Sequence, residues 1–382
     1  MKSLRVETLA PAASVFDNLS TGDREVLNEP AFKKMIAVER KRSERSKEPF
    51  LLMLVEVGSS AESAESRPVL ESMLAVLLDA SRETDLIGWY RQGVTAGVLF
   101  TGLMVTDKNL ILTTILNRVS NMLRGELTED QFSQVNLSFH FYPDDWDQTN
   151  PNGPTNKTLY PDLMNPGQRK LGLLVVKRTM DLMVSVIGIL LISPLLLAIA
   201  VAIKLTSKGP VLFKQQRVGQ FGKLFTVLKF RSMYANNDHS VHKDYVMKLI
   251  KDQAEKNADG SGVAVYKLTR DPRVTPLGQF LRRTSLDELP QVFNVFTGEM
   301  SLVGPRPAIP YELAAYQSWH RRRILEAKPG ITGLWQVKGR SLVKFDDMVR
   351  MDLRYASNWS LWLDLKILLM TPRAVIRGAG AC

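Results

Sequence analysis

Cysteine is almost absent from this chain of 382 residues: its single cysteine is Cys382. An intramolecular disulfide is therefore excluded, which suits a cytosolic protein. Histidine is also scarce, and the four histidines form no Cys/His cluster with the spacing of a zinc site. The first 20 residues lack the apolar core of a signal peptide. Wholesale disorder is excluded too, because 45% of the residues are hydrophobic and only 23% are charged.

Acidic residues become scarce in the second part of the chain. Residues 1–165 carry 17 Lys and Arg against 23 Asp and Glu, a net charge of −6. Residues 166–382 carry 33 against 16, a net charge of +17. The asymmetry predicts that the second part meets an anionic partner, which could be nucleic acid, a phospholipid surface or a phosphorylated small molecule.

The order of apolar and polar stretches predicts a tail, two domains and a linker. After a tail at residues 1–26, residues 27–143 alternate between helix and strand patterns, as expected for an α/β domain. Residues 144–168 are rich in Pro, Asn, Gly and Asp and are predicted to be a linker. The second domain then occupies residues 169–382.

An uncharged segment at residues 182–203, "LMVSVIGILLISPLLLAIAVAI", is long enough to cross a bilayer as a helix. Ser193 and Pro194 interrupt it near the middle, where proline bends a helix. Basic residues flank both ends, so the positive-inside rule gives no direction of crossing. We expect a re-entrant helix hairpin whose bend is protected by the Ser193 hydroxyl; the alternative is a single-pass helix with a proline kink. Residues 358–377 place two tryptophans beside an apolar run, which is typical either of a second membrane-facing element or of an ordinary buried helix of the domain.

An acidic pair, Asp287 and Glu288, stands out in the basic and apolar stretch "RRTSLDELPQVFNVFTGEMSLVGPRP". One interpretation is a capping box, in which the Ser285 side chain caps a helix and the side chain of Glu288, three residues later, accepts a hydrogen bond from the Ser285 backbone N–H. In another, a helix starts at Pro290 and leaves both carboxylates just before its N-terminus, where N–H groups attract anions such as phosphate.

The first domain resembles a nucleotide-cyclase-like domain of the GGDEF type. "RETDLIGWYRQGVTAGVLF" stands in the place of its signature hairpin, but Arg-Gln-Gly-Val-Thr at 91–95 replaces the signature residues. Glu56 is the only acidic residue left where the first-strand metal ligands would lie. Two-metal phosphoryl transfer needs carboxylates at those turns. The resemblance therefore implies a degenerate domain with a regulatory or oligomerising role, and homo-oligomerisation stays open.

Five motifs in the second domain resemble the monotopic phosphoglycosyl transferases among the bacterial sugar transferases. They are "FKQQRVGQFGKLFTVLKFRSM", "TRDPRVTPLGQFLRRTSLDELPQVFNV", "GEMSLVGPRP", "KPGITGLWQVKGR" and "LDLKILLMT". The resemblance implies transfer of a phospho-sugar from a UDP-sugar to polyprenol (undecaprenyl) phosphate. Asp287 would be the nucleophile that expels UMP and holds the phospho-sugar covalently. Glu288 would hold Mg²⁺ together with phosphate oxygens.

The resemblance also assigns roles to several residues outside the acidic pair. The phosphate-binding cations would be Lys229, Arg282, Arg306 and Arg340. Gln336 and Gly339 would line the uridine side. Arg178 and Asp181, three residues apart on a helix, are expected to pair at the membrane mouth.

The second domain is therefore predicted to be a mainly helical, membrane-associated enzyme on the cytoplasmic face of a bacterial inner membrane. It would start the assembly of an exopolysaccharide or other surface glycan, with a UDP-sugar, polyprenol phosphate and membrane lipid as partners. One rival interpretation is a non-catalytic membrane scaffold for polysaccharide assembly. A second rival, a nucleic-acid-binding protein, is disfavoured because no nucleic-acid module is recognisable.

Overall fold

The computed structural model describes ten stretches of the chain. They are residues 25–57, 66–103, 107–143, 156–164, 168–234, 240–254, 256–258, 264–266, 272–339 and 342–376. The chain divides into two compact units, and residues 156–165 belong to the first of them. The linker predicted at residues 144–168 is therefore too long, because its last part is folded into the two units. All but the end of the predicted tail lies outside the described residues.

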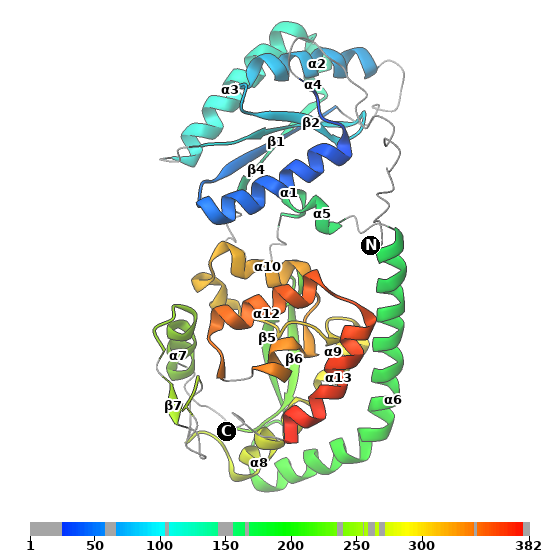
Figure 1. Cartoon of the computed structure of the whole chain (residues 1–382), viewed down its shortest axis with the longest axis vertical. Coiled ribbons are helices and arrows are strands. Elements are labelled where there is room, and N and C mark those ends of the chain that lie inside the picture. Colours follow the sequence, from blue (N-terminus) through cyan, green and yellow to red (C-terminus); the bar gives the residue numbers. More distant parts are fainter. Residues whose placement is uncertain are drawn as a thin grey trace, which may run out of the picture. The chain divides into compact units, whose positions relative to one another are not determined.

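The first unit is an antiparallel sheet with helices on both faces (Figure 1). Its elements are α1 (Glu29–Ser46), β1 (Phe50–Val57), α2 (Ser66–Ala80), β2 (Leu86–Arg91), β3 (Thr95–Phe100), α3 (Lys108–Glu126), α4 (Glu129–Ser133), β4 (Val135–Tyr142), η1 (Lys157–Leu159) and α5 (Pro161–Met164). The strand order is β2-β3-β1-β4, with every pairing antiparallel. The α/β order expected from the sequence is confirmed.

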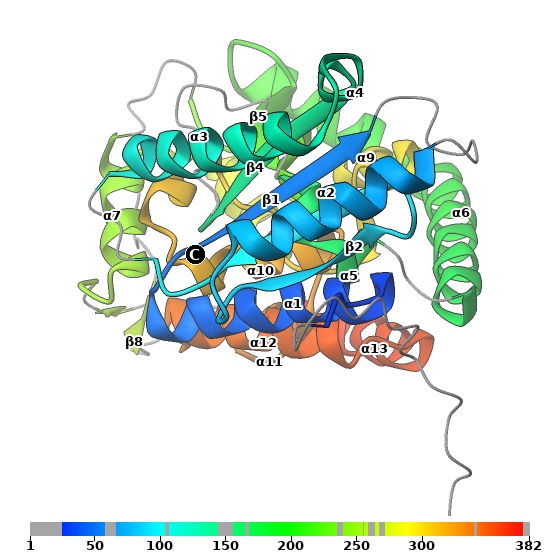
Figure 2. The same cartoon turned by 90° about the horizontal axis from the view of Figure 1, so that it is seen from above.

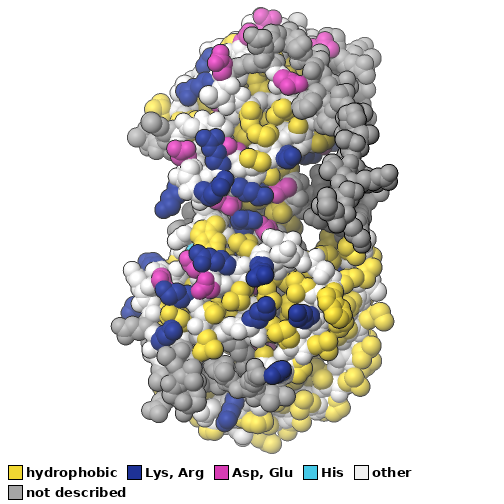
Figure 3. Space-filling model, in the orientation of Figure 1, with side chains coloured by type: hydrophobic (Ala, Val, Ile, Leu, Met, Phe, Trp, Pro, Cys, Tyr) yellow, Lys and Arg dark blue, Asp and Glu magenta, His cyan; other side chains and the backbone are white. Residues whose placement is uncertain are grey.

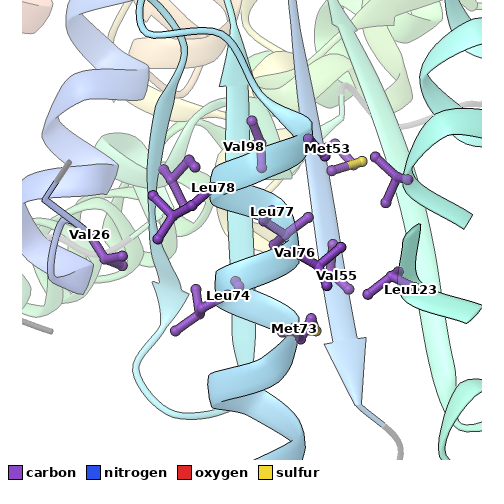
Figure 4. Close-up of a cluster of buried hydrophobic side chains, with 14 of the residues drawn as sticks. Val26, Met53, Val55, Met73, Leu74, Val76, Leu77, Leu78, Val98 and Leu123 are labelled. Carbon is purple, nitrogen blue, oxygen red and sulfur yellow. The ribbon is translucent and has the colours of Figure 1, made fainter. Parts of the chain in front are cut away.

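The central strand β1 is buried on both faces as far as Val55, which explains the unbroken apolar sequence of residues 50–55. Leu51, Met53 and Val55 point towards α2 and α3 and share a core with side chains of those helices (Figure 4). Residues between them face α1, where the Phe32 ring lies against the backbone of Gly97. Figure 2 shows α2 and α1 crossing the sheet.

The hairpin between β2 and β3 turns at Gly93, whose φ of +69° favours glycine. Glu56 lies beside this turn because it pairs with Thr95 in the sheet register. A guanidinium nitrogen of Arg91 lies 3.9 Å from the Glu56 carboxylate. The turn therefore presents a cation in the region where a cyclase-like domain would present acidic residues.

The end of the first unit is fastened to α1 by Arg40, which is almost fully buried. Its guanidinium donates two hydrogen bonds to Asp162, at 3.0 and 2.9 Å, and one to the Leu159 carbonyl. It also lies 4.5 Å from the centre of the Tyr160 ring. A bidentate arginine with its lone carboxylate partner is a specific anchor, so η1 and α5 pack on α1.

The second unit is mainly helical, as expected. Its elements are α6 (Gln168–Thr206), β5 (Leu212–Val218), η2 (Gln220–Gly222), β6 (Leu224–Phe230), α7 (Ser240–Ile250), β7 (Asn257–Ala258), β8 (Ala264–Val265), α8 (Pro276–Thr284), η3 (Leu286–Glu288), α9 (Gln291–Thr297), β9 (Ser301–Val303), η4 (Pro310–Ala315), α10 (Ser318–Glu326), β10 (Gly330–Thr332), α11 (Leu334–Lys338), α12 (Phe345–Ser357) and α13 (Leu361–Ile376). Its strands form two-stranded pairs: β5 with β6, β7 with β8, and β9 with β10.

The apolar segment forms part of one 39-residue helix, α6, which contains Pro194 and bends strongly (Figure 1). Proline has no N–H to offer the carbonyl of Leu190, four residues earlier. The Ser193 hydroxyl donates to that carbonyl at 2.9 Å instead. The helix is continuous across the bend, and the Ser193 hydroxyl satisfies the carbonyl that the proline leaves without a partner.

Helix α6 exposes most of its apolar side chains. By length and composition, Leu171–Thr206 could cross a membrane. An 18-residue window within it has a mean hydropathy of 2.9, and 11% of that window is buried. Leu190 and Leu191, next to the bend, are 69% and 75% exposed. Figure 3 shows hydrophobic side chains gathered over α6. Trp362 and Leu369 of α13 are exposed as well. A surface this apolar is suited to lipid rather than to water.

A buried ion pair joins α6 to α13. The Asp364 carboxylate is fully buried and accepts a 2.5 Å bond from Lys177 of α6. It also accepts hydrogen bonds from the Tyr355 hydroxyl (2.7 Å) and the Trp359 indole (3.1 Å). Lys177 and Tyr355 both donate to the carbonyl of Val303 as well. The network therefore ties α6, α12 and α13 to the end of β9.

Replacing Asp364 by Asn should destabilise the second unit by about 3–5 kcal/mol, because Lys177 keeps its buried charge and loses its counterion. Urea unfolding in detergent, followed by circular dichroism, measures the change. The matched control is Asp252→Asn, which breaks an exposed pair with Lys344 and should leave the unfolding midpoint unchanged. Equal midpoints for both variants would contradict a structural role for the buried pair.

Candidate active site

The strands β5 and β6 bring two basic residues to one face of a hairpin. Phe213 pairs with Lys229, and Arg217 pairs with Phe225. Residues 225 and 229 are four apart on β6, and side chains alternate between the two faces of a strand. Arg217 and Lys229 therefore project from the same face. The side chain of Asn294 on α9 fixes β6 in place, because it donates to Thr226 O (2.7 Å) and accepts from the Leu228 N–H (3.1 Å).

The acidic pair lies in the single 3₁₀ turn η3 between α8 and α9. Helix α8 ends at Ser285, which has a φ of +58° and whose side chain makes no capping hydrogen bond. The capping-box interpretation is therefore wrong. Pro290 precedes the first residue of α9, so Asp287 and Glu288 lie just before that helix, as the second interpretation predicted.

Glu288 is the centre of an ionic cluster. One of its carboxylate oxygens, Oε1, accepts from Lys229 Nζ at 2.6 Å and from Arg306 at 3.2 Å. Burial alone would raise the pKa of Glu288, but the two cations hold it well below its usual range. Glu288 is therefore ionised throughout the physiological range of pH.

Asp287 is buried next to this cluster, with 8% of its surface exposed. Burial raises the pKa of Asp287, and the neighbouring charges of Lys229, Arg282 and Arg306 oppose that rise. Among the described residues, no hydrogen bond holds its carboxylate. A carboxylate in such surroundings is poorly solvated and is left available to react.

A pocket opens between the hairpin and the loop that carries Arg306. It is lined by Arg217, Val227, Lys229, Gln291, Arg306, Pro307, Gly330 and Ile331. Three of these side chains are cations, two of which also bind Glu288. Such a group of cations suits an anion with several oxygen atoms, and phosphate is one that arginine binds through two parallel hydrogen bonds.

Arg217 is a member of this site that we did not identify from the sequence. It is 8% exposed and donates to the carbonyl of Pro307 at 2.9 Å and to Gln215 Oε1 at 3.1 and 2.7 Å. Burial and then the like charge of Arg306 lower the pKa of Arg217 to about 10. The signal was present in the quoted motif "FKQQRVGQFGK", but only the register of β5 and β6 shows that its arginine meets Lys229.

Backbone contacts hold Arg306 in its loop. The N–H of Gly304 donates to Thr332 O, and the N–H of Gly330 donates to Pro305 O, both at 2.9 Å. The carbonyl of Arg306 itself accepts from Arg323 at 2.9 Å. The parallel pair β9 and β10 therefore fixes the two residues that precede Arg306.

Other residues predicted for the site are placed differently. Gln336 donates to the Ile331 carbonyl at 3.2 Å, while its own carbonyl oxygen is buried and has no partner. Gly339 caps the end of α11, and Arg340 lies outside the described residues. Arg282, on α8, is close enough to influence the titration of Asp287.

The expected pairing of Arg178 with Asp181 is wrong. Arg178 donates instead to the carbonyls of Val295 (2.7 Å) and Phe296 (2.8 Å) at the end of α9. Asp181 accepts the N–H of Leu302 at 3.1 Å. A cation at a helix C-terminus satisfies carbonyls that have no partner within the helix. Both side chains thus fasten α6 to the elements that follow the acidic pair.

The described part of the chain contains no group of three His, Cys, Asp or Glu side chains that could hold a metal ion alone. Glu288 alone could supply one carboxylate oxygen as a ligand of Mg²⁺. Both of its hydrogen bonds are made by Oε1, so Oε2 has no hydrogen-bond partner among the described residues. One carboxylate oxygen with phosphate oxygens and water is a donor set that Mg²⁺ accepts.

The chain belongs to the bacterial sugar transferase family, whose model matches residues 173–378. All of the site residues described above lie within that match. The first unit lies outside it.

Curated relatives match the same part of the chain. An uncharacterised sugar transferase of Haemophilus influenzae is 43% identical over 218 residues, which are 57% of this chain and 44% of that protein. An undecaprenyl-phosphate galactose phosphotransferase of Salmonella typhimurium is 44% identical over 206 residues, 54% of this chain and 41% of that protein. The exopolysaccharide production protein ExoY of Rhizobium meliloti is 39% identical over 207 residues, 54% of this chain and 88% of that protein. The chain thus spans less than half the length of the first two relatives.

Solved structures of diguanylate cyclases match about a third of the chain. The DGC protein of Thermotoga maritima is 17% identical, with a TM-score of 0.25, and the match covers 31% of this chain and 84% of that one. These neighbours are of the class that the first unit resembles in sequence pattern.

Gly304→Ala should displace the loop that carries Arg306, because an added Cβ would lie 2.1 Å from the Lys328 carbonyl oxygen. Overpacking of this kind typically destabilises by about 1–3 kcal/mol. Gly188→Ala is the control, since its Cβ would meet nothing closer than 3.9 Å. Urea unfolding of both variants tests the point, and a stable Gly304→Ala protein would contradict the tight packing described here.

Proposed function

We propose that this protein transfers a sugar 1-phosphate from a UDP-sugar to polyprenol phosphate, releasing UMP. The observation that carries the proposal is the buried Asp287 carboxylate, which has no hydrogen bond among the described residues and lies beside a cluster of Glu288, Lys229 and Arg306. The names of relatives, such as the undecaprenyl-phosphate galactose phosphotransferase, support the same reaction. The product would begin an exopolysaccharide or other surface glycan, as the name of the ExoY relative suggests.

The reaction would proceed in two displacements at phosphorus. In the first, a carboxylate oxygen of Asp287 attacks the β-phosphorus of the UDP-sugar. A phosphorus–oxygen bond forms to Asp287, the bond to the bridging oxygen breaks, and UMP leaves with the electron pair. In the second, a phosphate oxygen of polyprenol phosphate attacks the same phosphorus and releases Asp287. Each step is easier than direct reaction between two anionic substrates in one complex.

Cations make the first step feasible, because an anionic nucleophile must approach a diphosphate. Lys229 and Arg306 line the pocket, and Arg217 lies beside them. Their charges would offset the repulsion between Asp287 and the phosphates and stabilise the charge that develops on the departing UMP. Arg282 and Arg340 would add further positive charge at the site, because the resemblance of the motifs assigns both residues to phosphate binding. Gln336 would contact the uridine side through its unpartnered carbonyl oxygen.

Mg²⁺ would be held by Glu288 together with phosphate oxygens of the substrate. When bound, the ion would neutralise charge on the diphosphate and so assist the loss of UMP. Glu288 itself keeps Lys229 and Arg306 in position, whether or not the ion is present.

Helix α6 would enter the membrane from the cytoplasmic face of a bacterial inner membrane and return to the same face. The bend at Pro194, the basic residues on both sides of the apolar segment and the exposed apolar surface support this re-entrant arrangement. It would place the site at the lipid–water boundary, where the phosphate of a polyprenol can reach Asp287 while its chain stays in lipid. The first unit would take no part in the chemistry, because the turn at residues 91–95 contains no carboxylate and carries Arg91 beside Glu56 of β1, where catalytic carboxylates would be needed.

Asp287→Asn should abolish UMP release from membranes supplied with UDP-sugars and polyprenol phosphate, because the amide keeps the shape of the side chain and is not a nucleophile. Glu288→Gln should also be severely impaired. Asp347→Asn, which alters an exposed carboxylate, is the control and should keep the parent rate. Activity of Asp287→Asn above a few per cent of the parent would exclude the covalent mechanism. A non-catalytic scaffold would release no UMP in any of the variants.

The rate should fall at acidic pH as Asp287 becomes protonated. Because burial raises the pKa of Asp287, this acid limb of the pH–rate profile should lie at a higher pH than the pKa of an ordinary aspartate. Arg282 favours the ionised carboxylate. Arg282→Gln should therefore move the acid limb of kcat/KM to higher pH, and Arg282→Lys should move it less. A profile that does not respond to Arg282→Gln would show that another group controls the limb.

A further inference from the structure

Helix α1 of the first unit carries a stripe of basic residues on its exposed face. Phe32, Ile36 and Arg40 are on the buried face of this helix. Lys34, Lys41 and Arg45 are exposed on the opposite face. Spacings of seven and four residues bring side chains to the same side of a helix. Figure 3 shows Lys and Arg side chains gathered where α1 runs.

The basic stripe, defined as Lys34, Lys41 and Arg45, is not neutralised within the first unit. None of the three forms an ion pair with a residue in the described ranges. The carboxylates of α1 are engaged elsewhere: Glu29 binds Lys33, and Glu44 accepts from the Tyr142 hydroxyl. The positive charge of this stripe is unusual in the first part of the chain, since residues 1–165 carry a net charge of −6.

The chain keeps this stripe close to a membrane if α6 inserts as proposed above, and the inference rests on that proposal. Only three residues separate α5, which ends at Met164, from α6, which begins at Gln168. An extended chain spans at most about 3.6 Å per residue, so the end of the first unit stays within roughly 14 Å of the start of α6. A tether this short gives the first unit a high effective concentration at the lipid surface.

We infer that the basic stripe of α1 docks the first unit onto anionic phospholipid headgroups of the membrane that holds α6. Each Lys or Arg close to an anionic leaflet adds to the attraction, and several on one helix face act together. Val38 lies between Lys34 and Lys41 in sequence and is 46% exposed, so the stripe also offers an apolar contact at its centre. The docking is electrostatic, so it weakens with salt.

A fluorescent probe at position 38 tests the inference in the full chain. Val38→Cys in a Cys382→Ser background is labelled and reconstituted into nanodiscs that contain lipid with a nitroxide headgroup as quencher. Neutral discs of phosphatidylcholine are compared with discs that contain one quarter phosphatidylglycerol. We expect quenching at least threefold greater in the anionic discs, and its loss in 0.5 M NaCl.

Charge reversals supply the matched control. Lys34→Glu, Lys41→Glu and Arg45→Glu together should abolish the extra quenching. Lys108→Glu, Arg118→Glu and Arg124→Glu together change the net charge by the same amount on α3 and should preserve it. Equal quenching in both kinds of disc, or quenching that survives the α1 reversal, would overturn the inference. The inference would also be overturned if the probe were shielded in neutral discs only when each disc holds two copies of the protein, because the stripe would then face a second copy.

UMP release from the same discs separates this inference from the proposed reaction. An active protein whose probe is unquenched in anionic discs would overturn membrane docking of α1 while leaving the transferase intact. Quenching without UMP release would support the docking and count against the reaction.

Discussion

The shared carboxylate oxygen of Glu288 is the contact on which the proposed site depends. It accepts from Lys229 of β6 and from Arg306 in the loop after β9, at 2.6 and 3.2 Å. Three parts of the second unit are therefore joined at one atom, and the residue beside it is the buried Asp287. Without the carboxylate, the two cations would repel each other across the pocket. With it, they stay close together and face the space that a diphosphate would occupy.

Helix α6 is part of the framework of this site. Lys177 binds Asp364, Arg178 caps the end of α9, and Asp181 accepts the N–H of Leu302. At the other end of the apolar segment, Arg231 donates to the carbonyl of Ser207 at 2.8 Å. Arg231 is two residues from Lys229 on the same stretch of chain. Both halves of α6 are thus fastened to segments that carry site residues. A change in the bend of α6 would therefore shift residues that line the pocket.

Sequence and structure agree best where local chemistry decides the outcome. The position of Asp287 and Glu288 before a helix followed from Pro290, and the grouping of Lys229 and Arg306 with this acidic pair followed from the motifs. Contacts between segments far apart in the sequence were harder to predict. The role of Arg217 depends on the register between β5 and β6, and Arg178 and Asp181 found partners on α9 and β9 rather than each other. Pro194 indicated a bend, but whether a helix breaks there depends on the hydroxyl that satisfies the freed carbonyl of Leu190. The extent of the linker depended on Arg40, more than a hundred residues away from Asp162.

The central claim is that Asp287 accepts the phospho-sugar covalently, and intact-protein mass spectrometry tests it most directly. The purified protein is given a UDP-sugar and Mg²⁺ without polyprenol phosphate and is quenched in acid, and the labelled peptide is then sequenced. The account predicts an added mass equal to that of the sugar phosphate, located on Asp287 and removed when polyprenol phosphate is supplied. Release of UMP with no such adduct, or an adduct on another residue, would contradict it.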